Sequence, residues 1–500
     1  MLIGEMLQKQ AVEHPHRPFI KIGEATYTFR EFNRLVNQTA AWLLRDYDIK
    51  KGAHISIILP NQIDFLLLFF AIARAGGVVV PMNPHFKADL LSYMVGQSES
   101  SLVICHRDVE MFETSESVKK IVIDNGEIVD LVRHIQDADL LPTDVNQDDL
   151  FSIIYTSGTT SRPKGVMNTQ SAYLAAGRDI SSALNISKDD VTYLFLPLFH
   201  ANPQFYGIMS ALIAGNTLLI DERFSASEFW KKAQQQEFTT FTYVGTVLSI
   251  LLKTMPFQAP LQHQIKGVGG GAPKETWEQL TAKCGLKIHE LYGMSETGGF
   301  VTINSVSKYK MGSVGITRDC VQVAILNEQD EVCGANVKGE IAIRPNQPNV
   351  IFDGYYNEPG KTVEVFSNLW FHTGDIGWFD QEGFFYFEGR KKDIIRKKGE
   401  NISPTYIEEV FQKLDVVKEA AAVGISDEIA GEEIKLCLVM EEKEFSIEKL
   451  VQWGKEHLPE IMMPRYFERM DAFPKTATEK IEKHKLKVLE DQVIDIKQSN

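Results

Sequence analysis

The sequence predicts an α/β fold that is built mainly on parallel sheets. Short runs rich in β-branched residues alternate with helical patterns for most of the 500-residue chain. After about residue 310 this alternation gives way to strands separated by turns, and strands and helices mix again beyond about residue 393. Alternation of strands and helices is typical of parallel sheets that carry helices on both faces.

The predicted strands of the first region share a β-branched or aromatic composition. They are SLVIC (101–105), KIVID (120–124), LFSIIY (150–155), VTYLFLPL (191–198), NTLLID (216–221) and FTTFTYV (238–244). Between them, segments such as TFREFNRLVNQTAAWLL place apolar residues at helical spacing. The most apolar run, Phe65 to Ala73, has about half of the ~20 residues that a membrane span needs, and Arg74 ends it, so we expect a buried helix.

Two changes of pattern divide the rest of the chain. The segments GSVGITRDCVQVAIL and KGEIAIRP predict a small antiparallel barrel or sheet. Beyond the basic turn around Lys392, Ser403-Pro404 predicts a helix start, because serine is a favoured N-cap and proline a favoured first helical residue. The strands VKEAAAVGI and IKLCLVM follow. We therefore predict one domain over 1–391 and an α+β domain over 392–500.

Composition excludes several classes of function. The formal net charge of −15 opposes nucleic-acid binding, which needs a basic surface. The five cysteines are scattered without a CxxC pair, which argues against a zinc site or a disulfide framework and predicts a reducing compartment. The opening segment MLIGEMLQKQAVEHP lacks the apolar core of a signal peptide. We expect a cytoplasmic protein without a membrane span.

The stretch YTSGTTSRPKG (155–165) predicts an anion site. It follows an apolar strand, and Gly158 and Gly165 allow close backbone approach. A loop of backbone N–H groups and hydroxyls can cradle phosphates, although a solvated Ser/Thr turn has the same composition. The hydroxyls and the cation that such a cradle would use are Thr156, Ser157, Thr159, Thr160 and Lys164. The stretch is not a Walker A loop, because no Gly-Lys-Ser/Thr follows at the required spacing.

Four further motifs carry candidate chemistry, and each also has an ordinary structural interpretation. In HELYGMSETGG, Tyr292 could stack on a base and Glu296 could bind magnesium, yet Ser-Glu-Thr is commonly a helix cap. In LWFHTGDIGWF, Asp375 could accept two ribose hydroxyls or simply occupy a turn. Six cations between Arg390 and Lys398 suit a polyphosphate or a solvated hairpin. Lys480 lies among many surface lysines.

The order and spacing of these motifs resemble the adenylate-forming superfamily, which includes acyl-CoA synthetases, peptide-synthetase adenylation domains and beetle luciferases. The resemblance extends from TYTFREFNRLVNQTA near the start to Lys480. It implies a large N-terminal domain of two doubly wound sheets plus a small β-barrel, followed by a small mobile α+β domain.

The resemblance also implies a nucleotide site. The loop from Thr156 to Lys164 matches the phosphate loop, Tyr292 the residue that stacks on adenine, and Ser295 the hydroxyl on the α-phosphate. Glu296 matches the magnesium ligand, and Lys480 the lysine that bridges the acyl carboxylate and the α-phosphate. The remaining nucleotide-binding positions are the loop residue Gly158, the adenine-side segment Gly270, Gly271, Ala272 and Pro273, the Gly293 that follows Tyr292, and the ribose pair Asp375 and Arg390.

The same resemblance implies a pocket for the acyl group, a hinge and a path for a thiol. The pocket residues are His200, as a gate, with Phe205, Tyr243, Val244, Gly269 and Phe300. Lys392 matches the hinge. The turn Gly399, Glu400 and Asn401 would come in beside the thiol after the small domain rotates.

The implied activity is that of an ATP-dependent acid–thiol ligase, an AMP-forming acyl-CoA synthetase that uses ATP, Mg²⁺ and coenzyme A and could work as a homodimer. Two alternatives stay open: an enzyme that loads a carrier-protein thiol, and a non-catalytic binder of nucleotide or acyl group. Ser161-Arg-Pro-Lys and SASEFW (225–230) are similar to carnitine/crotonobetaine-CoA ligase-like members. Ser161 and Glu479 stand where the superfamily commonly has glycine, and Glu479 should make the field at Lys480 less positive. The acid itself is not predicted.

Overall fold

The fold was examined in a computed structural model of the chain. It describes residues 1–135, 144–156, 163–256, 260–397, 400–427, 430–441, 446–476, 480–490 and 492–496. Ser157, Gly158, Thr159 and Thr160 of the predicted phosphate loop, together with Ser161, Gly399 and Glu479, lie outside the described residues.

The first sheet is mostly parallel and has the order β15-β14-β13-β12-β11-β9-β10-β1-β2. Its five central pairings, from β1–β10 to β12–β13, are parallel, and its two ends are antiparallel. Its strands are β1 (Pro18–Ile22), β2 (Ala25–Thr28), β9 (Val191–Leu194), β10 (Thr217–Ile220), β11 (Thr240–Val244), β12 (Lys266–Gly270), β13 (Lys287–Tyr292), β14 (Thr302–Ile303) and β15 (Ile316–Thr317).

The second sheet has the order β6-β5-β3-β4-β7-β8 and is parallel except for the last pair. Its strands are β3 (His54–Ile58), β4 (Val78–Pro81), β5 (Leu102–His106), β6 (Lys119–Ile123), β7 (Leu150–Thr156) and β8 (Lys164–Thr169). The antiparallel β7–β8 hairpin carries the predicted phosphate loop at its turn.

The third and fourth sheets follow in sequence order. The third is antiparallel: β16 (Val321–Leu326), β17 (Gly339–Pro345), β18 (Phe366–Ser367), β19 (Trp370–Phe379) and β20 (Phe385–Arg390). The fourth is mixed: β21 (Ile395–Lys397), β22 (Glu400–Ile402), β23 (Val417–Asp427), β24 (Gly431–Met440), β25 (Tyr466–Met470) and β26 (Ile494–Asp495). The predicted boundary at residue 392 falls between β20 and β21 and stays a prediction.

Helices fill the space between the first two sheets and cover their outer faces. One core cluster joins both sheets to the helices α1 (Ile3–Glu13), α2 (Phe29–Tyr47), α3 (Ile63–Ala75), α5 (Glu127–Val132), α6 (Gln170–Leu184) and α7 (Met209–Ala214). The outer face of the first sheet packs on α8 (Ala226–Gln234), α9 (Gly245–Lys253) and α10 (Lys274–Cys284). The outer face of the second packs on α4 (Ala88–Gln97). The predicted architecture of parallel sheets with helices on both faces is confirmed.

Local sequence explains how individual elements start. Helix α2 begins after Thr28, whose hydroxyl accepts from the Glu31 backbone N–H while the Glu31 carboxylate accepts from the Thr28 N–H. This reciprocal capping box satisfies two helix-end donors. The predicted strand at 191–198 is shorter than expected, because β9 ends at Leu194. Pro197 has no N–H with which to continue a sheet ladder.

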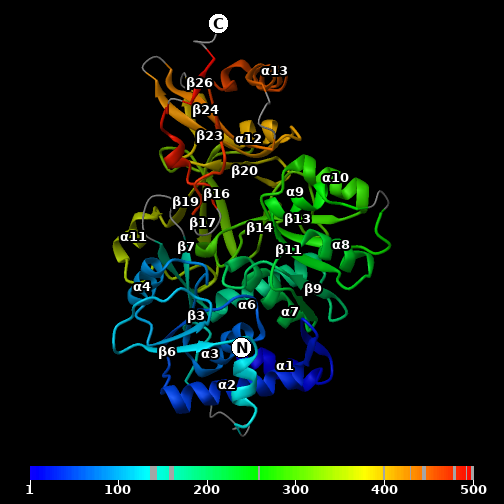
Figure 1. Cartoon of the computed structure of the whole chain (residues 1–500), viewed down its shortest axis with the longest axis vertical. Coiled ribbons are helices and arrows are strands. Elements are labelled where there is room, and N and C mark those ends of the chain that lie inside the picture. Colours follow the sequence, from blue (N-terminus) through cyan, green and yellow to red (C-terminus); the bar gives the residue numbers. More distant parts are fainter. Residues whose placement is uncertain are drawn as a thin grey trace.

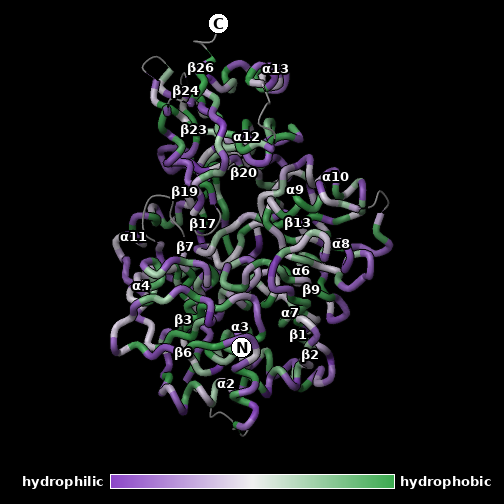
Figure 2. The backbone as a smooth tube through the Cα atoms, in the orientation of Figure 1, coloured by the Kyte–Doolittle hydropathy of each residue, from purple (hydrophilic) through white to green (hydrophobic). Residues whose placement is uncertain are grey.

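The interior is apolar and continuous. In α3, which the sequence predicted as a buried helix, every residue except Arg74 is buried. Figure 2 shows hydrophobic positions gathered along the strands in the middle of the body and hydrophilic ones on the outer turns. Within the described part of the chain, no helix is both long and apolar enough to cross a membrane.

The fourth sheet and its helices form a smaller unit at one end of the molecule, where the chain ends (Figure 1). Its helices are α12 (Pro404–Gln412) and α13 (Ile447–His457). Helix α12 starts at the predicted Ser403-Pro404, but the Ser403 hydroxyl donates to the Glu388 carbonyl of β20 at 2.6 Å instead of capping its own helix. The remaining helical segments are α11 (Pro359–Glu364) and the short turns η1 (Pro203–Ile208), η2 (Ser295–Thr297), η3 (Glu460–Met462) and η4 (Lys483–Leu486).

Candidate active site

Two distant segments meet at Asp375. In the β19–β20 hairpin Asp375 lies directly opposite Arg390, and the Arg390 Nε is 2.9 Å from Asp375 Oδ1. The Tyr292 hydroxyl, at the end of β13, donates to Asp375 Oδ2 at 2.7 Å. Burial raises the pKa of Asp375, while Arg390 and Tyr292 act in the opposite direction. Apart from this ion pair with Arg390, the buried Oδ1 atom accepts no hydrogen bond from the described residues, so it keeps acceptor capacity for a ligand hydroxyl.

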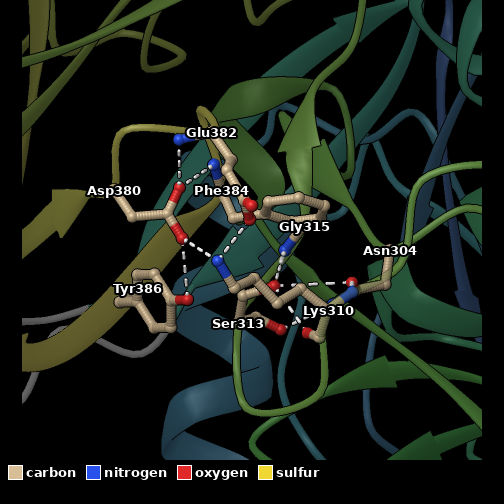
Figure 3. A network of polar contacts seen from close by, with 8 residues as sticks. All are labelled: Asn304, Lys310, Ser313, Gly315, Asp380, Glu382, Phe384 and Tyr386. Carbon is tan, nitrogen blue, oxygen red and sulfur yellow. Dashed lines mark hydrogen bonds and ion pairs between the residues drawn. The ribbon is translucent and has the colours of Figure 1, made fainter. Parts of the chain in front are cut away.

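A polar network holds the hairpin that carries Asp375 and Arg390 (Figure 3). The Lys310 ammonium donates to Asp380 at 2.7 Å and to Glu382 at 2.5 Å, both in the turn between β19 and β20. The Tyr386 hydroxyl donates to Asp380 at 3.0 Å, and the Lys310 backbone N–H donates to Asn304 Oδ1 at 2.8 Å. Because Asn304 follows β14, which pairs with β13, the network fixes the hairpin relative to the strand of Tyr292.

Glu296 lies near the end of the hydroxyl-rich loop at which Lys164 stands. The Tyr355 hydroxyl donates to Glu296 Oε1 at 3.1 Å. The Lys164 ammonium lies 4.7 Å from the centre of the Tyr355 ring, within the range of a cation–π contact. Thr156 pairs with Lys164 across the β7–β8 hairpin, so both described ends of the loop face the Glu296 region.

The residues at Glu296 fit a magnesium ion. Glu296 is half-buried on the turn η2, and among the described residues its carboxylate accepts a hydrogen bond from a single hydroxyl group. Mg²⁺ usually keeps several waters and binds through one or two carboxylates plus substrate phosphates. A metal site formed by protein side chains alone would need several ligands. The described residues contain no cluster of three or more His, Cys, Asp or Glu side chains that could hold a metal.

Close packing shapes the loop that follows Tyr292. A Cβ atom on Gly293 would lie 2.2 Å from the Phe300 Cα, so only glycine fits there. The buried Arg318 donates to the Thr297 carbonyl at 3.1 Å and to the Val350 carbonyl at 3.0 Å, and its guanidinium lies over the Phe300 ring. Sequence reasoning missed Arg318, because it stands in a turn with no motif around it.

Lys480 reaches this site from the C-terminal unit. Its backbone and that of Thr476 close a turn: the Thr476 N–H donates to the Lys480 carbonyl at 2.7 Å, and the Lys480 N–H donates to the Thr476 hydroxyl at 3.2 Å. Desolvation lowers the pKa of the Lys480 ammonium although solvent still reaches the residue, and Arg390 lowers it further. Glu296 and Asp375 act in the opposite direction. The two carboxylates, Arg390 and Lys480 are therefore electrostatic neighbours.

The predicted acyl-pocket residues fall into two groups. The first lies on adjacent strands: Tyr243 and Val244 end β11 beside Gly269 of β12, and Asn202 donates to the Tyr243 carbonyl at 2.9 Å. His200 belongs to the same segment as Asn202. Burial and the nearby Lys480 lower the pKa of His200 to about 4, so its imidazole is neutral at physiological pH.

The second group lies deeper. Phe205 is fully buried on the π-helical turn η1 and stacks on Tyr173 with ring centres 4.1 Å apart. Phe300 is fully buried and meets Tyr206 edge-on at 6.0 Å. A Cβ on Gly299 would lie 3.0 Å from Phe205, so the loop after Glu296 packs against this group. Short π-helical turns are frequent at functional sites.

The adenine-side segment is held by a residue that sequence reasoning missed. Gly270 ends β12, Gly271 has a φ of 86°, and Pro273 precedes α10. The backbone N–H groups of Gly271 and Ala272 both donate to Glu290 Oε1. Glu290 stood in the quoted HELYGMSETGG motif, but nothing in its spacing distinguished it from a strand residue.

The predicted hinge lies on the exposed turn between β20 and β21. Lys392 itself is exposed. The preceding Lys391 is fixed, because its N–H donates to the Gly374 carbonyl at 2.8 Å and its ammonium to Glu340 at 2.9 Å. Of the predicted thiol-side turn, Glu400 and Asn401 lie in β22, paired with Lys397 and Arg396.

Among the residues that the structure describes, an ion pair joins the two units. Lys413, which follows α12, lies 3.0 Å from Glu275 in the first turn of α10. Glu409 on α12 is close to both. Burial first and the Glu275 carboxylate second raise the pKa of Glu409 to about 7, while Lys413 acts in the opposite direction.

Comparison with known proteins places this site in a family. The AMP-binding enzyme family matches residues 7–356, and the C-terminal domain of AMP-binding enzymes matches residues 406–480. Oxalate–CoA ligase of Arabidopsis thaliana is 30% identical over 96% of this chain and 97% of its own length. A crotonobetaine/carnitine–CoA ligase of Escherichia coli O139:H28 is 28% identical over 92% of this chain and 93% of its own.

A solved structure agrees with this comparison. The O-succinylbenzoate coenzyme A synthetase of Bacillus subtilis, in complex with ATP and magnesium ion, superposes with a TM-score of 0.86 at 27% identity, covering 97% of this chain and 99% of its own. The resemblance that the motifs carried is confirmed, including the similarity to crotonobetaine/carnitine–CoA ligases. This chain belongs to the AMP-binding enzyme family.

Proposed function

We propose that this protein is an AMP-forming acyl-CoA synthetase, which adenylates a carboxylic acid with ATP and passes the acyl group to coenzyme A. The family and the relatives named as CoA ligases support this activity. The observation that carries it is the meeting of Tyr292 and Arg390 at Asp375, in a cluster whose charges, with that of Glu296, act on Lys480. A carrier-protein thiol as acceptor is not favoured, because the named relatives are CoA ligases.

The nucleotide would lie along the convergent residues. Asp375 accepts the two ribose hydroxyls, and the ion pair with Arg390 favours the ionised form of its carboxyl group. Tyr292 and the segment from Gly270 to Pro273 take the adenine. The phosphates extend towards Lys164 and the loop before it, and the Ser295 hydroxyl donates to the α-phosphate.

Adenylation brings two anions together. An oxygen of the acid's carboxylate attacks the α-phosphorus, a new P–O bond forms, and the bond to the β-phosphate breaks with release of pyrophosphate. Lys480 stabilises the charge that builds up between carboxylate and phosphate. Glu296 would hold Mg²⁺, which when bound would supply further positive charge to the phosphate oxygens. Because His200 is neutral, it adds no positive charge next to Lys480.

Thioester formation needs a different arrangement. Lys480 serves the first step alone, so the C-terminal unit would rotate about Lys392 once the acyl-adenylate has formed. The turn that includes Glu400 and Asn401 then lies along the path of the thiol. The thiolate sulfur attacks the acyl carbon, and the bond to AMP breaks.

Pyrophosphate release across a panel of acids tests the activity and identifies the acid. The panel includes oxalate, crotonobetaine, carnitine and O-succinylbenzoate, which the relatives' names mention, together with medium-chain and aryl acids. Release that depends on one acid, with turnover that depends on coenzyme A, supports the ligase. ATP binding without release for any acid supports a non-catalytic binder.

Lys392→Pro is expected to separate the two half-reactions. Proline fixes φ near −65°, so the hinge loses the freedom that rotation requires. Acyl-adenylate formation should continue, while thioester formation from a supplied acyl-adenylate should fall at least tenfold. Quenched-flow measurement of each half-reaction checks this, with Lys391→Ala as the control at the neighbouring position. Normal thioester formation in Lys392→Pro would refute the pivot.

Lys413→Ala is expected to favour the second half-reaction slightly. The Lys413–Glu275 pair is present in the orientation described here. Without Lys413, the interface keeps the Glu275 and Glu409 carboxyl groups and loses the cation that acts on both. An exposed pair contributes about 0–1 kcal/mol, so the orientational equilibrium should shift by up to about fivefold. The ratio of the two half-reaction rates measures the shift. Lys418→Ala, which removes a pair confined to the C-terminal unit, should leave that ratio unchanged.

We further place the enzyme in the cytoplasm and propose that it functions as a homodimer. Free thiols at all five cysteines, four of them buried, suit a reducing compartment. Light scattering of the purified chain tests the dimer, and a monomer mass at working concentration would reject it.

A further inference from the structure

Glu290 is a buried carboxylate inside the first sheet, two residues before Tyr292 on β13. Its side chain is enclosed, and the residue is 5% exposed. Oε1 accepts from the backbone N–H of Gly271 and from that of Ala272, the latter at 3.0 Å. Oε2 accepts from the Tyr243 hydroxyl at 2.5 Å. Glu290 thus binds the segment assigned to adenine and a residue assigned to the acyl pocket at once.

The sheet register explains why these groups meet. Gly269 of β12 pairs with Tyr243 of β11 on one side and with Glu290 of β13 on the other. Since paired residues of neighbouring strands point to the same face, Tyr243 and Glu290 flank Gly269. A Cβ on Gly269 would lie 2.1 Å from the Tyr243 carbonyl oxygen. The same Cβ would lie 3.1 Å from the Cδ2 atom of the Tyr243 ring, so the ring passes close over Gly269 on its way to the carboxylate.

We propose that Glu290 is a positioning residue for acyl-adenylate formation, which holds the Gly271–Ala272 backbone and the Tyr243 ring in one fixed arrangement. The inference rests on the proposed function, because that function assigns Gly271 and Ala272 to the nucleotide and Tyr243 to the acid. If the Glu290 carboxylate were displaced, the Gly271–Ala272 backbone and the Tyr243 ring would lose their fixed positions together. The sites of both substrates would then be affected at once. Loss of a purely structural contact would instead lower stability and leave the kinetics of the folded enzyme unchanged.

The protonation state of Glu290 gives this role a distinctive signature. Burial raises the pKa of Glu290 to about 7, while Tyr243 and the two N–H groups act in the opposite direction. Its three partners all donate hydrogen bonds to it. The ionised carboxylate accepts all three, whereas a protonated carboxyl group places its own hydrogen against one of these donors. The titratable groups nearby are Tyr243 and, acting on Tyr243, Tyr309. Both keep their protons at neutral pH, because burial raises the pKa of each. Adenylation should therefore weaken as the pH falls through about 7.

The test compares Glu290→Gln, Glu290→Ala and a matched control, Asp64→Asn. Asp64 is also a buried carboxylate that accepts two backbone N–H groups, those of Gly126 and Ile128, and burial raises its pKa as well. None of its partners belongs to the site. Acid-dependent pyrophosphate release is measured from pH 6 to 8.5 with KM determined separately for ATP and for the acid, and melting temperature is followed in parallel.

Glu290→Ala should lower kcat/KM for ATP and for the acid by about 10²-fold each, because three buried donors lose their acceptor. Glu290→Gln keeps an oxygen for the two N–H groups but places an NH₂ group against the Tyr243 hydroxyl, as the protonated carboxyl does. Its activity should therefore stay near that of the wild-type enzyme at low pH and should not change through pH 7. Titration of ATP itself affects both proteins equally, so the difference between their profiles reports Glu290. Asp64→Asn should melt earlier and keep the wild-type pH profile.

Two results overturn the proposal. One is a Glu290→Ala enzyme that melts earlier yet keeps both kcat/KM values within twofold of wild type. The other is a Glu290→Gln enzyme whose pH profile matches that of wild type. Absence of acid-dependent pyrophosphate release in the wild-type enzyme is a separate failure, which rejects the proposed function as a whole.

Discussion

Lys480→Ala is expected to reduce acid-dependent pyrophosphate release by about 10²- to 10³-fold, the usual effect of removing one preorganised charge or donor from a transition state. The charges of Arg390, Glu296 and Asp375 all act on Lys480, and in the proposed mechanism the acid's carboxylate and the α-phosphate meet there. Without its ammonium, two anions approach each other with less compensation. Thioester formation from a supplied acyl-adenylate should stay within about twofold, because the proposed rotation takes Lys480 out of the site before that step.

Lys475→Ala is the control for this experiment. Lys475 belongs to the same segment, but its Nζ atom forms an ion pair at 2.7 Å with Glu419 Oε2, which also lies within the C-terminal unit. Its removal should leave both half-reactions close to wild type. An equal loss of rate in both half-reactions of Lys480→Ala would show that the substitution disturbs the protein in general and does not act specifically on the first step.

Asp375→Ala is expected to weaken ATP binding by about 10²-fold. The substitution removes the acceptor for the ribose, and it also leaves the buried Tyr292 hydroxyl without its 2.7 Å partner and Arg390 without its carboxylate. Hydrogen bonds to a charged group contribute about 1.5–3 kcal/mol each, so the loss of one or two accounts for the expected change. Isothermal titration calorimetry with ATP and Mg²⁺ measures the affinity.

Two variants show whether the effect belongs to the ribose site. Asp319→Ala removes an exposed aspartate just before β16 and should keep wild-type affinity. Tyr292→Phe removes one donor to Asp375 but keeps the carboxylate and its pairing with Arg390, so it should weaken binding less than Asp375→Ala does. Unchanged affinity in Asp375→Ala would reject the ribose assignment.

The fold was largely readable from local patterns. The strands at 101–105, 120–124 and 150–155 and the helix that starts at Ser403-Pro404 were predicted within one or two residues of β5, β6, β7 and α12. Each depends on periodicity and caps within a few residues. The strand at 191–198 was predicted too long, since an apolar run does not say which of its residues find a neighbouring strand.

The supporting residues of the site were not readable in this way. Glu290, Tyr355 and Arg318 act through partners far along the chain: Glu290 bonds Tyr243 across 47 positions and Tyr355 bonds Glu296 across 59. No local pattern marks such a residue, because its partner is chosen by the order of strands in a sheet. Arg318 likewise bonds two carbonyls from separate loops.

By itself, the sequence determined the chemical groups of the site and their order: the hydroxyl-rich loop, Glu296, Asp375, Arg390 and Lys480. Tertiary structure decided that Tyr292 and Arg390 meet at Asp375, that Glu290 joins Tyr243 to the Gly271–Ala272 backbone, and that the charge of Asp375 acts on Lys480. The reason is physical. A motif encodes local conformation through backbone sterics and side-chain spacing, whereas the convergence of distant segments depends on sheet order, register and the burial of charge, and these exist only in the folded chain.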